Sequence, residues 1–419
     1  MRRCQWKNLV RASCLLLALG SCRPEPESAA AARKRQLPGH WLLYFTARQD
    51  EQGRTQARYF RDEPGYNANR QAPQAIAFTA DSIEFLNGIF SEGPPDSVYK
   101  HSRPRIYRGN FARYRLRGDS ILWEHPADKC WQLLGRVQRL RNDTLLLAPP
   151  VVPEEMPPRT VALREGYRRL PPAARRPTYD EIAFSVHGWT SFSIVLVTRE
   201  GQVLFQENRG QPGIRVGQLT PYQRELLFSK FEQIDTATAA RRAGGGIDGD
   251  VAATCLIRDH KIVASFRDWG MMLREMNGAK ELQWAYVPAY FLPRTLHYPP
   301  PPPLTPPFNS SLLFDYFVLG HDELPLERAE SLFLWHELQQ SRPTTAAIAL
   351  HDTLRFWHFR GPAPQAEGAT AEAFRPVAIL TDGRYYRFCF ANKTTTTLDL
   401  GYNFIARNGL AQRRRPKSY

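Results

Sequence analysis

The sequence predicts a β-rich, multidomain protein, in which an N-terminal antiparallel β-barrel is followed by one or two α+β domains. Short apolar runs separated by turn residues fill residues 37–170. Strand pairs then occur together with helices in residues 178–298 and 308–408, and proline-rich stretches separate these regions. A composition of 42% hydrophobic and 12% aromatic residues is sufficient for several packed cores.

The barrel is predicted from strands that are joined by tight turns. A first strand opens at residues 41–45, and residues 105–107 are expected to form one of the middle strands. Hairpins are predicted at Arg117-Gly118-Asp119 and Asn142-Asp143, because Gly, Asn and Asp tolerate the positive φ that such turns need.

The two ends of this region resemble a known family. Gly39-His40-Trp41 is similar to the Gly-x-Trp motif of lipocalin-like domains, and Tyr167-Arg168-Arg169 is similar to their last strand. The resemblance implies that Trp41 packs across the closed end of the barrel and that a basic residue, Arg168 or Arg169, covers it. We take Gly39, Trp41 and Arg168 as the structural motif. The many aromatic residues of these strands favour an interior filled by side chains over one that holds a ligand.

Residues 178–298 are predicted to form an α+β domain with the order β-β-β-α-β-β. Thr220-Pro221 is a typical helix start, and Asp259-His260 is predicted to join the last two strands. This order resembles uncharacterised bacterial lipoprotein domains that carry a Cys-x-Gly-x-Cys-Pro segment. Gly188 is retained here without the cysteines, so no thiol role follows from the resemblance.

Residues 299–307 are expected to form a polyproline linker, since seven prolines lie between Pro299 and Pro307. Residues 308–408 are predicted to form an α+β domain with a helix at about residues 326–340, apolar on one side. Residues 409–419 are expected to be a frayed basic tail. Whether residues 178–408 form one domain or two stays open.

The N-terminus predicts a lipid anchor. Leu19-Gly20-Ser21-Cys22 looks like a lipobox, and it follows a basic start and a short apolar run. That run is too short to span a ~30 Å hydrocarbon core, which needs roughly 20 residues. We therefore expect a signal peptide at residues 1–21, lipidation of Cys22, and a flexible tether at residues 22–36. The expected location is the bacterial cell envelope, at the outer rather than the inner membrane.

The net charge of +15 does not indicate nucleic-acid binding, because an exported protein does not meet the chromosome. Arginine in place of lysine across a solvated surface explains the charge most simply. The expected partners are a membrane, through the lipid anchor, and an envelope protein or polysaccharide.

Motifs that carry chemistry are incomplete in this sequence. His336-Glu337 begins like a zinc-protease motif, but the second histidine is replaced by Gln340. We predict no catalytic residue, no metal site and no cofactor, and a non-enzymatic binding or structural role. The alternatives are a carrier of small hydrophobic ligands and, less favoured, an envelope hydrolase. A hydrolase would draw on a pool of His187, His260, His321, His336 and Asp250.

One recurring pattern allows two interpretations. Asp precedes a hydroxyl residue and an aliphatic residue at four positions, and the hydroxyl residues are Ser82, Ser120, Thr144 and Thr353. Turn chemistry explains the pattern, because Asp closes a turn and Ser or Thr begins the next strand. The pattern also resembles the O-glycosylation consensus of some envelope-dwelling bacteria.

Overall fold

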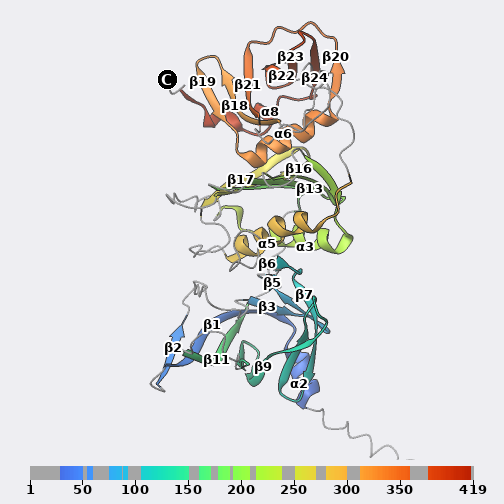
Figure 1. Cartoon of the computed structure of the whole chain (residues 1–419). Helices are drawn as coiled ribbons and strands as arrows, with labels where there is room; N and C mark the ends of the chain where they lie inside the picture. Colours follow the sequence, from blue (N-terminus) through green and yellow to red (C-terminus); the bar gives the residue numbers. More distant parts are fainter. Residues whose placement is uncertain are drawn as a thin grey trace, which may run out of the picture. The chain divides into compact units, whose positions relative to one another are not determined.

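The computed structural model describes residues 29–50, 54–59, 75–86, 88–92, 105–150, 160–170, 178–188, 192–207, 214–237, 251–269, 280–299, 312–358 and 376–416. These residues belong to two compact units (Figure 1). Described residues up to 59, 75–85 and 111–170 belong to the first unit, and 86–110 and 178–416 to the second. Cys22, the signal peptide and most of the proline linker lie outside the described residues. No helix in the described ranges is long and apolar enough to cross a membrane.

The first unit is a closed antiparallel barrel of the up-and-down, lipocalin-like type. Eight strands form the ring, in the order β1-β3-β4-β7-β8-β9-β10-β11, and β11 returns to pair with β1. β2 pairs with the second half of β1, whose first half pairs with β3. The strands are β1 (Gly39–Asp50), β2 (Thr55–Tyr59), β3 (Ala75–Phe78), β4 (Ser82–Phe85), β7 (Phe111–Arg117), β8 (Ser120–Glu124), β9 (Trp131–Leu140), β10 (Thr144–Ala148) and β11 (Thr160–Arg169). The β-rich fold with a leading barrel is confirmed.

Trp41 is fully buried and is covered by an arginine of the last strand. Its indole Nε1 donates to the Leu37 carbonyl at 2.7 Å, and the Arg169 guanidinium lies 4.4 Å from the ring centroid. Arg169 also donates to the Pro38 carbonyl at 2.8 Å. Gly39 has a φ of +134°, and a Cβ there would lie 3.0 Å from the Arg169 side chain. The positive φ favours a glycine at this position, and the close approach of Arg169 adds to this preference.

The covering residue is Arg169, and not Arg168. Arg168 is exposed, and its guanidinium lies 5.6 Å from the Tyr44 ring centroid. Successive strand residues point to opposite faces, so two adjacent arginines of β11 cannot both cover Trp41.

The tether is helical over its second half, so the expectation of a flexible segment is wrong for residues 29–36. Helix α2 (Ala29–Gln36) begins with four alanines, the residue of highest helix propensity. Arg33 donates from Nη1 to the Gly118 carbonyl at 3.1 Å, which attaches the helix to the β7–β8 turn.

The expected barrel strand at residues 105–107 belongs to the second unit instead. β6 (Arg105–Tyr107) pairs with β5 (Phe90–Glu92), and neither strand joins the barrel sheet. Tyr107 stacks on Phe291 at a centroid distance of 5.3 Å, and Phe90 contacts the same ring edge-on at 5.1 Å. Burial of these aromatic rings against a helix of the second unit explains why the segment leaves the barrel.

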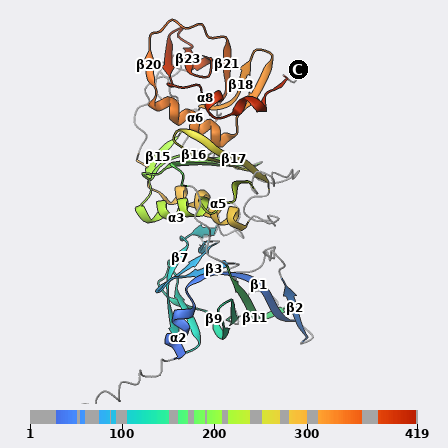
Figure 2. The ribbon, with the colours of Figure 1, turned by 180° about the vertical axis from the view of Figure 1, so that it is seen from behind.

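A six-stranded antiparallel sheet lies at the centre of the second unit, in the order β15-β14-β13-β12-β16-β17. Its strands are β12 (Glu181–His187), β13 (Phe192–Thr198), β14 (Gln202–Glu207), β15 (Arg215–Gln218), β16 (Val251–Arg258) and β17 (Lys261–Trp269). Helices α3 (Pro221–Phe231) and α5 (Lys280–Thr295) cover one face (Figures 1 and 2). The start of α3 is as predicted, with Thr220 and Gln223 forming a capping box. Helix α5 was not predicted, because Pro288 and Pro293 lie inside it.

The C-terminal part of the unit contains a second sheet, in the order β20-β24-β23-β22-β21-β18-β19-β25. Its strands are β18 (Leu312–Leu319), β19 (Asp322–Pro325), β20 (Arg342–Thr344), β21 (Asp352–His358), β22 (Pro376–Thr381), β23 (Tyr385–Phe390), β24 (Thr395–Asp399) and β25 (Arg415–Pro416). The short helices α8 (Phe404–Arg407) and η1 (Leu410–Arg413) follow β24.

Helix α6 (Arg328–Gln340) is buried between the two sheets (Figures 1 and 2). One hydrophobic core contains α6 residues, inward residues of the middle sheet such as Leu196 and Ile257, and Phe314 and Phe388 of the C-terminal sheet. The helix lies where predicted, but the expectation of a single apolar side is wrong. Residues 178–416 therefore form one compact unit.

The C-terminal tail is folded as far as residue 416, against expectation. Leu410 is fully buried, and β25 pairs with β19. Arg413 forms an ion pair at 2.7 Å with Glu330 of α6, whose side chain is fully buried. Burying a carboxylate without a partner costs free energy, so the ion pair with Glu330 stabilises the position of the tail on the fold.

Candidate functional site

A cluster of buried polar groups lies where α6 meets the middle sheet. Glu181 comes from the first residue of β12, in the centre of that sheet. It is buried, and its main chain pairs with both neighbouring strands, opposite Thr198 and Ile257. Because the strand is paired on both sides, the sheet sets the backbone position of Glu181.

His260 reaches the cluster from the turn between β16 and β17. Asp259 and His260 both have positive φ, at 52° and 55°, as in a type I′ turn. Three contacts hold this turn. The Asp259 N–H donates to Asp180 Oδ2 at 2.7 Å, the Ile262 N–H donates to Asn408 Oδ1 at 2.7 Å, and Arg407 donates to the Asp259 carbonyl.

Helix α6 contributes His336 and Glu337, which are buried neighbours on the helix. Successive helical residues are rotated by about 100°, so they face different partners. Glu337 Oε1 lies 2.9 Å from His260 Nδ1, and Glu337 Oε2 accepts from the Tyr402 hydroxyl at 2.7 Å.

His336 connects the helix to the first carboxylate. Its Nδ1 lies 3.3 Å from Glu181 Oε2, and its Nε2 lies 2.7 Å from the amide nitrogen of Gln340. An amide nitrogen only donates, so Nε2 accepts and Nδ1 carries the hydrogen that is donated to Glu181.

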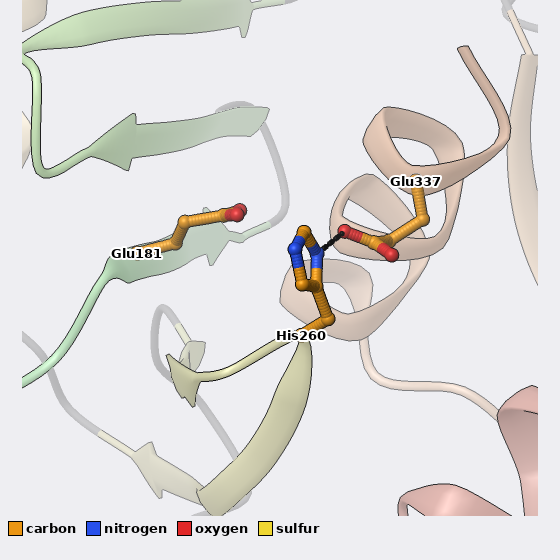
Figure 3. A group of neighbouring side chains, drawn as sticks. All are labelled: Glu181, His260 and Glu337. Carbon is orange, nitrogen blue, oxygen red and sulfur yellow. Dashed lines mark hydrogen bonds and ion pairs between the residues drawn. The ribbon is translucent and has the colours of Figure 1, made fainter. Parts of the chain in front are cut away.

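The three groups of the site converge from three elements. Donor atoms of Glu181, His260 and Glu337 lie within 4.8 Å of one another. Figure 3 shows the His260 imidazole between the two carboxylates, with its hydrogen bond to Glu337. The two carboxylates are buried, whereas 58% of the His260 side chain is exposed, so this histidine is the solvent-facing side of the site.

Burial and the hydrogen bond between His260 and Glu337 shift the pKa values of the cluster. Burial, and next the Glu337 carboxylate, raise the pKa of Glu181 to about 7. The hydrogen bond with Glu337 raises the pKa of His260, while burial lowers the pKa of His336. Burial raises the pKa of the Tyr402 hydroxyl, which therefore stays a hydrogen-bond donor at neutral pH.

This arrangement suits charge pairing and cation binding better than nucleophilic catalysis. Its members are carboxylates, imidazoles and a phenol, and none is a serine or cysteine nucleophile. Two carboxylate oxygens and one imidazole nitrogen from Glu181, His260 and Glu337 could together hold a metal ion.

Two of the five pool residues meet in this cluster, and two others lie away from it. His260 and His336 both contact its carboxylates. His187 ends β12, six residues and roughly 20 Å from Glu181, and His321 is exposed in the β18–β19 turn. Asp250 lies outside the described residues.

The carboxylates Glu181 and Glu337 were not expected at a site. Glu181 begins an apolar strand, and Glu337 was considered only as part of the incomplete zinc-protease motif. The burial of these two carboxylates could not be predicted, because the sequence does not show that α6 is covered by a sheet on each side. With one apolar side expected for the helix, a polar residue outside that side had no reason to be buried.

Three of the four hydroxyl residues of the Asp-Ser/Thr pattern make hydrogen bonds of ordinary turn geometry. Ser82 bonds with the Thr79 hydroxyl at 2.6 Å, Thr144 donates to Asp143 at 3.0 Å, and Ser120 donates to Asp119 at 3.4 Å. Thr353 lies in β21 and pairs with Val318 and Leu380. The turn interpretation accounts for the first three positions, and glycosylation stays a prediction.

Cysteine contributes no ligand to the site. Cys130 is exposed and Cys255 is fully buried, and both are free thiols, as is Cys389. Burial raises the pKa of the Cys255 thiol well above its ordinary value, so it acts as a core residue.

Comparison of the chain with protein-family models, with curated proteins and with solved structures found no match.

Proposed function

We propose that this chain is a lipid-anchored protein of the bacterial cell envelope with a non-enzymatic, structural or binding role. Its sequence carries the lipobox-like Leu19-Gly20-Ser21-Cys22. A lipocalin-like barrel directly after such a tether is the arrangement of the bacterial lipoproteins that the sequence resembles. We place the anchor in the outer membrane, with an envelope protein or polysaccharide as partner.

The buried polar site carries the structural part of the proposal. Apart from the bond between His336 and Gln340 within α6, its hydrogen bonds join different elements. His336 of α6 bonds Glu181 of the middle sheet, His260 of the middle sheet bonds Glu337 of α6, and Tyr402 bonds Glu337 from beyond β24. The site thus joins the helix to the middle sheet and to the segment between β24 and α8. We call this set of bonds the lock, because it helps to hold the two α+β modules together.

A carrier of small hydrophobic ligands is the alternative role for the barrel. Trp41 and Tyr167 are fully buried, and the Tyr167 hydroxyl donates to the buried Glu165 at 3.0 Å. Large buried side chains favour a filled barrel, so we expect no saturable binding of a fluorescent fatty acid. Sub-micromolar binding, competed by a natural lipid, would support the carrier instead.

The anchor is tested by Cys22→Ala. Without the acyl-accepting thiol, we expect the protein to leave the membrane fraction after signal cleavage or to accumulate as an uncleaved precursor. Membrane fractionation and intact-mass spectrometry measure both results. Cys130→Ala is the matched control, because it removes an exposed thiol far along the chain. A Cys22→Ala protein that still gains acyl mass and sediments with membranes would disprove the anchor.

The lock is tested by Tyr402→Phe. Removal of the hydroxyl leaves a buried oxygen of Glu337 without this donor, and an unsatisfied buried acceptor costs about 1–3 kcal/mol. We expect the free energy of unfolding of the second unit, measured by denaturant titration in the presence of a chelator, to fall by that amount. Tyr385→Phe, on β23 outside the site, should be neutral. Equal stability of the two variants would contradict the structural role.

A further inference from the structure

The fold fixes the backbone positions of the three converging residues before any ligand arrives. Glu181 is fixed by a central strand, Glu337 by a helix packed between two sheets, and His260 by a turn with three outside contacts. A site assembled from rigid elements loses little conformational entropy when it binds a ligand.

We propose that Glu181, His260 and Glu337 bind one divalent transition-metal ion, with Zn²⁺ as the reference ion. The proposal rests on the structural role of the site, because the metal would strengthen the lock between α6 and the middle sheet.

The spacing of the donors fits such an ion. Zn²⁺ lies about 2.0–2.2 Å from nitrogen and oxygen ligands, so two ligands on one ion are about 3–3.5 Å apart. His260 Nδ1 and Glu337 Oε1 are 2.9 Å apart, and donor atoms of all three residues lie within 4.8 Å. A modest side-chain movement of Glu181 completes the approach, and glutamate has the rotatable bonds for it.

The donor types select the class of metal. Imidazole together with carboxylate suits zinc and its first-row neighbours, whereas calcium takes six to eight oxygen ligands. The two buried carboxylates also face each other across one partly exposed imidazole (Figure 3). A divalent cation would offset the charge of these two buried carboxylates, and it would be reached from the side of the exposed His260.

Both residues of the turn that carries His260 have positive φ. A two-residue turn with both φ values positive favours Asn-Gly or Asp-Gly, because glycine adopts this conformation without strain. This chain has Asp259-His260 there, with φ of 52° and 55°. An imidazole therefore occupies the position that suits glycine best, at the place where it completes the donor set.

Outer hydrogen bonds orient two of the ligands, as in established metal centres. Tyr402 donates to Glu337 Oε2 and leaves Oε1 toward His260, while His336 donates to Glu181 and is itself held by Gln340. In metal sites, loss of such an outer partner weakens affinity about 10–100-fold.

The experiment uses the full-length protein, which is stripped with a chelator and titrated with Zn²⁺. Bound zinc is counted by elemental analysis and native mass spectrometry, and the thermal midpoint is followed with and without the ion. We expect the wild type to bind one zinc ion per chain at the site of His260. We expect the thermal midpoint of unfolding to rise when this zinc binds. His260→Gly should keep the turn, since Asp-Gly favours it, and should weaken zinc affinity at least about 10–100-fold.

Two further variants keep the result decisive. Glu181→Gln removes a ligand from a different element and should weaken zinc affinity as His260→Gly does. His321→Gly makes the same change in another exposed turn and should bind zinc like the wild type. Absence of bound zinc in the wild type, or unchanged affinity in His260→Gly, would overturn the proposal. The lock itself is judged separately by Tyr402→Phe in chelator, so either idea can fail alone.

Discussion

Arg169 illustrates how one side chain closes the barrel. Its guanidinium lies on the fully buried Trp41 ring, and it satisfies backbone carbonyls of Gln36 and Pro38. These carbonyls lie at the point where α2 ends and β1 begins. A single arginine therefore ties the last strand to the entry of the chain into the barrel.

Arg169→Met should destabilise the barrel, because it keeps the length of the side chain and removes the charge and the donors. Hydrogen bonds to a charged group contribute about 1.5–3 kcal/mol, and a cation–π contact adds about 0.5–1 kcal/mol. We expect hydrogen exchange in β1 and β11 of the full chain to become faster by an amount equivalent to about 2 kcal/mol or more. Arg168→Met should stay within about 0.5 kcal/mol of the wild type. If the two variants were equally affected, the covering role of Arg169 would be wrong.

The sequence was sufficient to find some of these residues and not others. Trp41 and Gly39 were identified by a short motif, and His260 and His336 were in the histidine pool. The choice between Arg168 and Arg169 depends on the strand face, which shifts with every residue and with each β-bulge between β1 and β11. Glu181 and Glu337 had no local signal, because their burial results from the packing of distant elements.

At the scale of elements, α6 organises the second unit. A helix packed against one sheet needs one apolar stripe, whereas α6 packs against two sheets and buries residues around its whole circumference. Its polar residues are therefore buried and need hydrogen-bond or ion-pair partners inside the protein. Glu330 pairs with Arg413, His336 hydrogen-bonds with Glu181, and Glu337 hydrogen-bonds with His260. The location of α6 followed from its sequence, but the two-sided burial did not.

Arg413→Ala should destabilise the second unit by removing a contact of the C-terminal tail. It leaves the fully buried Glu330 carboxylate without its cation, and breaking a buried ion pair in this way costs about 3 kcal/mol or more. We expect a lower thermal midpoint for the second unit and faster hydrogen exchange at the start of α6. Arg414→Ala, at the adjacent exposed position, is the control and should have little effect. A stable Arg413→Ala protein would show that the tail is dispensable.

At the scale of the whole molecule, the two units are not consecutive in sequence. The segment 86–110 lies between β4 and β7 of the barrel, yet it belongs to the second unit. Alternation of apolar residues predicted both the barrel and the later α+β elements. It could not show which sheet a short strand joins, because β6 has only three residues and its burial depends on Phe291, far along the chain.

This interleaving predicts the result of limited proteolysis. The proline-rich residues 171–177 separate β11 from β12, and we expect an early cut there, because few backbone hydrogen bonds protect such segments. The cut should not release the barrel. The N-terminal fragment keeps Phe90 and Tyr107, and both rings pack on Phe291 of the other fragment. Aromatic side chains of this kind bury 150–250 Å² each, which favours continued association.

The two fragments should therefore elute together from a size-exclusion column under native conditions and separate in denaturant. Tyr107→Ala combined with Phe90→Ala removes the stacked rings and should let the fragments separate after the same cut. Phe45→Ala is the control, since this ring stacks on Tyr59 within the first unit and should leave the association unchanged. If the wild-type fragments separated without denaturant, the packing of segment 86–110 on α5 would be too weak to join the two units, and the barrel would be an independent domain as its sequence first indicated.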